Sequence, residues 1–144
     1  MPYPQSEKKL ITPNFDSKSI LLGEDDMDDV EFLKEMFSSV DNSFSLTFIH
    51  DGKKVLDHLD ELSEDQLPCL IVLDYNMPAL NGAQILQEVR ANPRYDDIPK
   101  IIWSTSPSDV YRKKCLEAGA DNYVTKPSSV NELLQTIQYM LSFC

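Results

Sequence analysis

Five polar side chains follow short apolar segments of the sequence, and their chemical types suit the transfer of a phosphoryl group. They are Glu24, Asp25, Asp74, Thr105 and Lys126. Carboxylates that lie close together repel each other, and a hard, oxygen-liganded cation such as Mg²⁺ relieves that repulsion. A lysine ammonium and a threonine hydroxyl can both contact phosphoryl oxygens. If the five residues meet in space, a carboxylate among them can accept a phosphoryl group as an acyl phosphate.

The segments that carry these residues alternate with segments of helical periodicity. Short apolar runs at 19–23, 46–49, 69–73, 101–105 and 122–124 predict five strands. Apolar residues at helical spacing follow each run, most clearly after Ser129. Strands that alternate with helices imply an α/β fold, with a parallel sheet and helices on both faces. Because ligands bind at the carboxyl ends of such strands, we expect the five polar residues to meet at that edge.

Charge and hydropathy limit the classes of function. The chain has 144 residues, with 24 acidic against 13 basic side chains, which gives a net charge of −11. Such a chain is repelled by nucleic-acid phosphates and by anionic membranes, so neither is an expected partner. No apolar run reaches the roughly 20 residues of a membrane span, and the N-terminus lacks the apolar core of a signal peptide. The sequence predicts a cytoplasmic protein.

Four stretches of the sequence, taken together, resemble the receiver domain of two-component response regulators. They are ILLGEDD (20–26), LIVLDYNMP (70–78), the strand end at Thr105 and GADNYVTKP (119–127). The resemblance extends over about residues 18–143. It implies a flavodoxin-like, doubly wound (βα)5 fold, a three-layer sandwich around a five-stranded parallel sheet. The sequence is also similar to the single-domain regulators that are paired with bacterial phytochromes.

The resemblance implies a magnesium site and a phosphoacceptor. Asp74 would accept the phosphoryl group and contact the metal. Asp25 would bind Mg²⁺ directly, Glu24 would do so through water, and Asn76 would offer its backbone carbonyl. The phosphoryl donor would be a sensor histidine kinase or a histidine phosphotransfer protein. The protein would catalyse only its own phosphorylation and slow dephosphorylation, and we do not expect an enzyme with other substrates.

The resemblance also implies how phosphorylation is read out. Thr105 and Lys126 would contact the phosphoryl oxygens, and a cis Lys126–Pro127 bond would aim the lysine. Thr105 would then move toward the phosphoryl group, and Tyr123 would rotate inward to change the surface offered to a downstream protein. That target is not identified by the sequence.

Two other functions share part of this pattern. One is a receiver-like module that only binds partners, without phosphorylation. Degenerate modules of that kind usually lose the acceptor aspartate or the lysine, whereas this chain keeps Asp74 and Lys126. The other is an aspartyl-phosphate hydrolase, which normally carries Asp-x-Asp at the nucleophile. Residues 74–76 read Asp-Tyr-Asn, so the second acid is missing.

The remaining expectations concern domain organisation, cysteines and assembly. Residues 1–17 are expected to form a flexible leader and residues 18–144 the receiver domain, with no output domain after the last helix. Three cysteines do not make a disulfide framework, so Cys69 is expected in the core and Cys144 as a terminal thiol. The apolar stripe of the last helix also predicts a homodimer, through the face made by the fourth helix, the fifth strand and the fifth helix.

Overall fold

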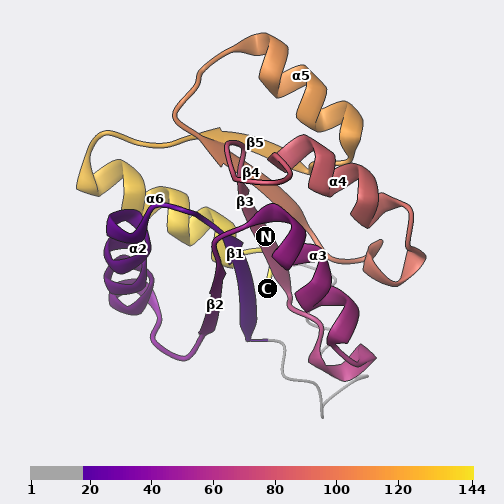
Figure 1. Cartoon of the computed structure of the whole chain (residues 1–144). Coiled ribbons are helices and arrows are strands. Elements are labelled where there is room, and N and C mark those ends of the chain that lie inside the picture. Colours follow the sequence, from indigo (N-terminus) through magenta and orange to yellow (C-terminus); the bar gives the residue numbers. More distant parts are fainter. Residues whose placement is uncertain (1–17) are drawn as a thin grey trace.

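Five parallel strands form the centre of the molecule in a computed structural model that describes residues 18–144 (Figure 1). The strands are β1 (Ser19–Gly23), β2 (Ser45–Ile49), β3 (Leu70–Asp74), β4 (Lys100–Ser104) and β5 (Asn122–Thr125). Their order across the sheet is β2-β1-β3-β4-β5. The predicted parallel sheet is therefore confirmed. The leader expected at residues 1–17 lies outside the described residues.

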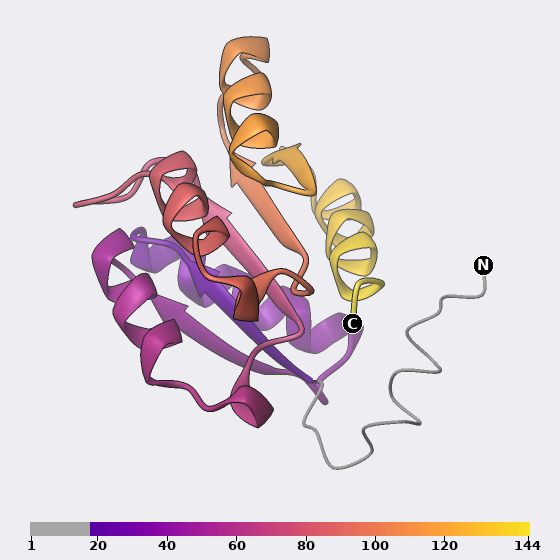
Figure 2. The same ribbon diagram turned by 90° about the vertical axis from the view of Figure 1, so that its right-hand side faces the viewer.

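Two layers of helices enclose this sheet, as Figure 2 shows from the side. The helices are α2 (Met27–Val40), α3 (Gly52–Glu61), α4 (Gly82–Arg90), α5 (Asp109–Ala118) and α6 (Val130–Leu141), with 3-10 turns η1 (Glu64–Gln66) and η2 (Pro93–Tyr95). Helices α2 and α6 pack on one face, and α3, α4 and α5 on the other. This is the flavodoxin-like three-layer sandwich that the sequence predicts. None of the helices within residues 18–144 is long and apolar enough to cross a membrane.

The central strand β3 is buried along its whole length, and this explains its uninterrupted apolar sequence. Ile71 and Leu73 pack under α3, α4 and α5, whereas Leu70 and Val72 pack under α2 and α6. A strand covered on both faces has no solvent-facing side on which polar residues could alternate. The first polar residue of β3 is Asp74, at its carboxyl end, and the fold thereby delivers this side chain to one edge of the sheet.

The apolar stripe of α6 is used mainly inside the molecule. Leu133, Ile137 and Met140 are buried in the core shared with α2. Val130 and Tyr139 remain 54% and 40% exposed. Packing inside the molecule thus accounts for most of the apolar stripe of α6, from which the homodimer was predicted. The homodimer itself stays a prediction.

The expectation that Cys144 is a terminal thiol is wrong, whereas Cys69 packs against the core shared by α2 and α6 as expected. The structure joins the two cysteines in a disulfide, with Cα atoms 5.4 Å apart and a separation of 75 positions in the sequence. Cys69 immediately precedes β3, and Cys144 follows α6 by a short turn. The fold brings these two points together at the amino edge of the sheet, a proximity that sequence spacing does not reveal. Cys115 on α5 is buried and free.

Candidate functional site

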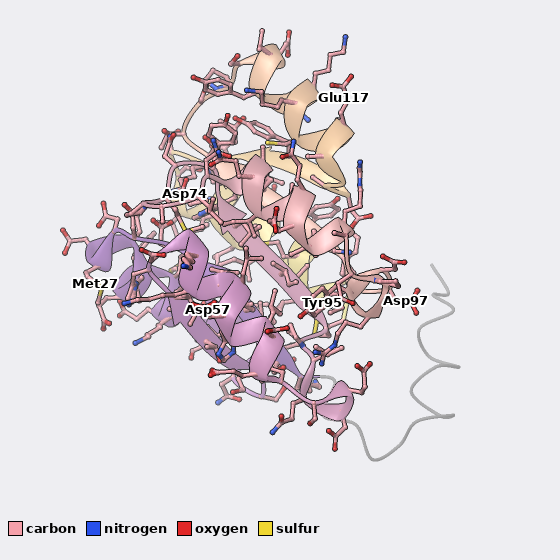
Figure 3. All side chains as sticks on the ribbon, turned by 45° about the vertical axis from the view of Figure 1, so that its right-hand side comes forward. Met27, Asp57, Asp74, Tyr95, Asp97 and Glu117 are labelled. Atoms are coloured by element: carbon pink, nitrogen blue, oxygen red, sulfur yellow. A yellow bond between two sulfur atoms is a disulfide. The ribbon has the colours of Figure 1, made fainter. Side chains whose placement is uncertain are left out.

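Three carboxylates meet at the carboxyl edge of the sheet. Oxygen atoms of Glu24, Asp25 and Asp74 all lie within 4.8 Å of one another. They meet because β1 and β3 are paired neighbours, with Gly23 opposite Leu73, so that the residues following each strand emerge side by side. Figure 3 shows Asp74 at this edge. Glu24 and Asp74 are buried and Asp25 is exposed, so the group opens to solvent on the Asp25 side.

Lys126 completes this group from the end of β5. Its Nζ lies 3.0 Å from Asp74 Oδ2 and 3.1 Å from Glu24 Oε1. The backbone N–H of Lys126 donates to the carbonyl of Ser104 at 2.7 Å, which holds the end of β5 against β4. The structure thus brings together four of the five residues from which the sequence argument began.

The Lys126–Pro127 bond is trans, since no cis peptide occurs in the described residues, and the expected cis bond is wrong. The trans form is the favoured one even before proline. With the trans bond, the Lys126 ammonium donates to the carboxylates of both Glu24 and Asp74.

Burial and neighbouring charge shift the pKa values of this group. Burial raises the pKa of Glu24, the charge of Asp74 raises it further, and Lys126 offsets part of the shift. Burial by itself would lower the pKa of Lys126, but Asp74 and Glu24 outweigh it and hold the pKa above its ordinary value. The lysine therefore stays charged beside the Asp74 carboxylate. Three carboxylates lie together here with one lysine ammonium, so a further cation would reduce the repulsion between them.

The donor set fits Mg²⁺. Mg²⁺ is typically bound through one or two carboxylates, with waters and phosphate oxygens completing its shell. Asp25 and Asp74 provide such carboxylates, and Glu24 lies beside them. The backbone N–H of Asn76 donates to Asp74 Oδ1 at 3.2 Å, which orients the Asp74 side chain. Coordination by the Asn76 carbonyl stays a prediction.

The loop that carries Asn76 is held against the start of α3. The backbone N–H of Gly52 donates to the Pro78 carbonyl at 3.0 Å. A Cβ atom on residue 52 would collide with the Leu80 carbonyl, so this close approach requires glycine. The Asp51-Gly52 pair, which reads as a simple break in the sequence, therefore helps to position one side of the site.

Trp103 is a site neighbour that sequence reasoning assigned only to the core. It is buried in β4, opposite Asp74 in the sheet register. Its indole N–H donates to Glu24 Oε1 at 3.4 Å, and Lys126 Nζ lies 5.2 Å from its ring centroid. The β3–β4 register would have revealed this position, but a single sequence does not determine register. As the only tryptophan of the chain, Trp103 is a natural fluorescent reporter of the site.

The structure does not bring Thr105 into the group. Thr105 is exposed just beyond the end of β4. Among residues 18–144, neither the Thr105 hydroxyl nor the Ser104 hydroxyl makes a hydrogen bond with Asp74 or Lys126. The buried hydroxyl at this strand end belongs to Ser104, whose Oγ accepts from the backbone N–H of Ser106 at 3.1 Å. Because that bond uses an oxygen lone pair, the Ser104 hydroxyl proton stays available for donation.

Tyr123, the predicted switch residue, is turned inward in the structure. Its side chain is buried, and its hydroxyl donates to the Ser106 carbonyl at 2.6 Å. The Arg112 guanidinium covers the ring, 5.2 Å from its centroid. Ser106 therefore joins two hydroxyls, because its N–H bonds to Ser104 and its carbonyl to Tyr123. These contacts hold the ring in its inward position.

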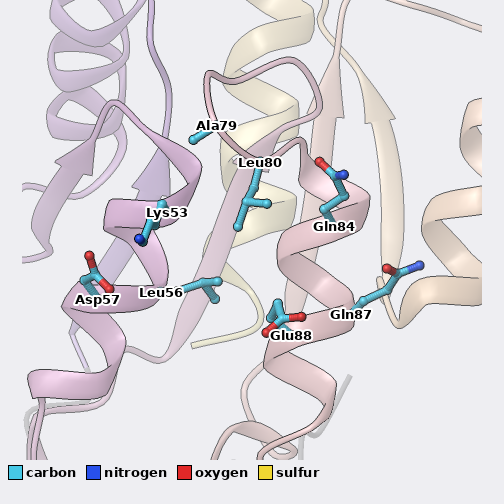
Figure 4. A pocket seen from close by; sticks show the side chains of 8 residues that line it. All are labelled: Lys53, Leu56, Asp57, Ala79, Leu80, Gln84, Gln87 and Glu88. Carbon is cyan, nitrogen blue, oxygen red and sulfur yellow. The ribbon is translucent and has the colours of Figure 1, made fainter.

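A surface groove of about 520 Å³ lies between α3 and α4, apart from the carboxylates (Figure 4). It is lined by Lys53, Leu56, Asp57, Ala79, Leu80, Gln84, Gln87 and Glu88. None of the carboxylates of the site lines it, and it holds no buried nucleophile. The groove is therefore separate from the carboxylate group at the carboxyl edge of the sheet.

Comparisons with known proteins agree with this geometry. The family model for the response regulator receiver domain matches residues 20–138. The response regulator MprA of Mycobacterium bovis is 34% identical over 125 residues, which is 87% of this chain and 51% of that protein. The chain thus spans about half the length of the curated relatives it matches.

Solved structures resemble nearly all of the described fold. The phosphorylated cyanobacterial phytochrome response regulator RcpA is 25% identical with a TM-score of 0.77, covering 88% of this chain and 96% of that one. The receiver domain of a sensor histidine kinase from Pseudomonas aeruginosa is 26% identical with a TM-score of 0.71, covering 88% and 98%. That structure has a magnesium ion coordinated in its active-site cleft.

Proposed function

Because the chain belongs to the response regulator receiver domain family, we propose that it accepts a phosphoryl group on Asp74 from a phosphohistidine. The donor would be a sensor histidine kinase or a histidine phosphotransfer protein. The observation that carries this proposal is the buried Asp74 carboxylate, held 3.0 Å from the Lys126 ammonium and grouped with Glu24 and Asp25. The narrower likeness to phytochrome-associated regulators is supported by the similarity to RcpA.

In the proposed reaction an Asp74 oxygen bonds to phosphorus while the bond from phosphorus to the donor histidine nitrogen breaks. The imidazole leaves with the bonding electron pair and takes up a proton. The Lys126 ammonium would contact the phosphoryl oxygens during the transfer and neutralise part of their negative charge. Glu24, Asp25 and Asp74 would hold Mg²⁺, which would neutralise further charge on the phosphoryl group when bound. Slow attack of water on the phosphorus of the acyl phosphate then releases inorganic phosphate and returns the free Asp74 carboxylate.

The proposal is tested by mixing the protein with a small phosphodonor and following its intact mass. We expect the mass to rise by one phosphoryl group in the presence of Mg²⁺ and to stay unchanged when a chelator removes the metal. A protein that never gains the group under either condition would instead match the partner-binding module. Steady turnover of a generic phosphoester, without retention of phosphate, would match the hydrolase.

Ser104, in place of Thr105, is proposed as the hydroxyl that senses the phosphoryl group. Ser104 is connected to Tyr123 through Ser106, whereas Thr105 has no such connection. A phosphoryl oxygen is a charged and therefore stronger acceptor than a neutral group, so it would draw the Ser104 hydroxyl toward Asp74. That movement would disturb the Ser106 loop and the Tyr123 hydroxyl bound to it.

We expect Ser104→Ala to lose most of the response to a phosphoryl mimic and Thr105→Ala to keep it. The measurement is the NMR shift change of α5 amides on adding Mg²⁺ and beryllofluoride. Removing Ser104 should cost the coupling free energy typical of such switches, about 1–3 kcal/mol. Both variants should still bind the mimic, because Lys126 and the carboxylates remain. If Thr105→Ala is the variant that loses the response, the original assignment of Thr105 stands.

Partner, assembly and location are further parts of the proposal. Met27 is the first residue of α2 and Val130 the first residue of α6, and both are exposed apolar side chains beside the site. They would contact the phosphoryl donor.

A homodimer would use the exposed Val110 and Leu116 of α5 with Tyr139 of α6. A cytoplasmic location stays a prediction.

A further inference from the structure

Asp29 contacts the site lysine, although the sequence assigns it only to a solvated helix start. Its Oδ2 lies 3.4 Å from Lys126 Nζ, which makes it the third carboxylate around that ammonium after Asp74 and Glu24. The Asp29 side chain is 43% exposed, against 10% and 1% for those two. Lys126 is therefore shared between two buried carboxylates and one at the surface.

Asp29 differs from the other two because it lies outside the group that fits a metal ion. That group consists of Glu24, Asp25 and Asp74. A magnesium ion and the Lys126 ammonium compete for the oxygens of Glu24 and Asp74, since two cations repel each other at short distance. For Asp29 this competition does not arise. Among the described residues, Asp29 is the carboxylate partner of Lys126 that lies outside the group suited to a metal ion.

Asp29 is also held in place by the start of α2. The Asp26 side chain caps this helix, and its Oδ1 accepts from the backbone N–H groups of Asp28 at 2.9 Å and Asp29 at 3.3 Å. An N-cap of this kind orders the first turn of a helix. The Asp29 carboxylate thus projects from an ordered turn and can hold the flexible lysine side chain.

We propose that Asp29 is a positioning residue for Lys126, which draws the ammonium toward α2 and leaves the oxygens of Glu24 and Asp74 free for Mg²⁺. This inference rests on the proposed function, because it concerns the same magnesium-dependent site. Without the Asp29 charge, Lys126 stays on Glu24 and Asp74, and the metal has to displace it. Loss of Asp29 therefore weakens magnesium binding through the lysine.

The test is a Mg²⁺ titration followed by the fluorescence of Trp103, which lies against both Glu24 and Lys126. We expect Asp29→Asn to raise the dissociation constant about threefold, the scale of a half-exposed ion pair. Asp28→Asn is the matched control, because it removes the same charge from the same helical turn without touching Lys126. It should change the constant less than twofold, about the size of a weak surface effect. Asp29→Glu keeps the charge and should restore binding close to wild type.

A double-mutant cycle separates positioning from simple loss of charge. In a Lys126→Gln background the ammonium no longer competes with the metal, so Asp29→Asn should then weaken Mg²⁺ binding no more than Asp28→Asn does. If Asp29→Asn weakens binding equally in both backgrounds, Asp29 acts as a distant charge and the inference is overturned. Wild-type-like binding by Asp29→Asn overturns it as well. A wild type that binds no Mg²⁺ would overturn the magnesium-dependent function itself, and the inference with it.

Discussion

Asp74→Asn is expected to abolish phosphoryl gain by this protein. The amide nitrogen and oxygen of asparagine match the shape of the carboxylate but lack its negative charge, so the side chain cannot act as the nucleophile. With a small phosphodonor and Mg²⁺, intact-mass spectrometry should show one added phosphoryl group on the wild type and none on the variant. We expect complete loss, because Glu24, the other buried carboxylate in contact with Lys126, is expected to serve the metal through water and not to accept the phosphoryl group.

Asp57→Asn is the matched control for that experiment. Asp57 is an exposed carboxylate on α3, away from the site, so this variant should gain the phosphoryl group as the wild type does (Figure 3). Thermal unfolding of both variants would confirm that each is folded. Labelling of Asp74→Asn to the wild-type level would refute the assignment of Asp74 as acceptor.

Cys144→Ser is expected to lower the free energy of unfolding of the oxidised protein substantially. The disulfide closes a loop between residues 75 apart in sequence and ties the end of α6 to the start of β3. Cross-linking restricts the unfolded chain, and loss of a bond that closes such a loop typically costs about 2–4 kcal/mol. Urea unfolding followed by circular dichroism gives the difference directly.

Reduction supplies the control for the cysteine prediction. Wild type treated with a thiol reductant should unfold at the same urea concentration as Cys144→Ser, and the reductant should leave the variant unchanged. Cys115→Ser is less suitable, because Cys115 is buried and its loss perturbs the core. Equal midpoints for oxidised wild type and Cys144→Ser would show that the bond contributes nothing to stability.

Much of the fold could be predicted from the sequence because its signals are local. The run from Leu70 to Leu73 is apolar throughout, a pattern typical of a strand covered on both faces. Strands that alternate with helices leave few topologies, and in all of them the carboxyl ends share one edge. The meeting of Asp25, Asp74 and Lys126 follows from that rule alone.

The features that sequence reasoning missed depend on register and on contacts between distant segments. Whether Ser104 or Thr105 is the buried hydroxyl depends on where β4 ends, a matter of one residue, and strand boundaries are the least determined part of a sequence pattern. Asp29 reads as an ordinary acid of a helix start, because nothing near it in sequence indicates that Lys126 will lie 3.4 Å away.

The sequence by itself determined the chemical groups at the edge of the sheet, because strand ends and residue types are written locally along the chain. Only the tertiary structure decided how those groups are shared: Lys126 among three carboxylates, Ser106 between Ser104 and Tyr123, and Cys69 with Cys144. The physical reason is that each of these contacts is made by packing between elements, and its distance depends on helix placement and side-chain orientation that no local pattern encodes.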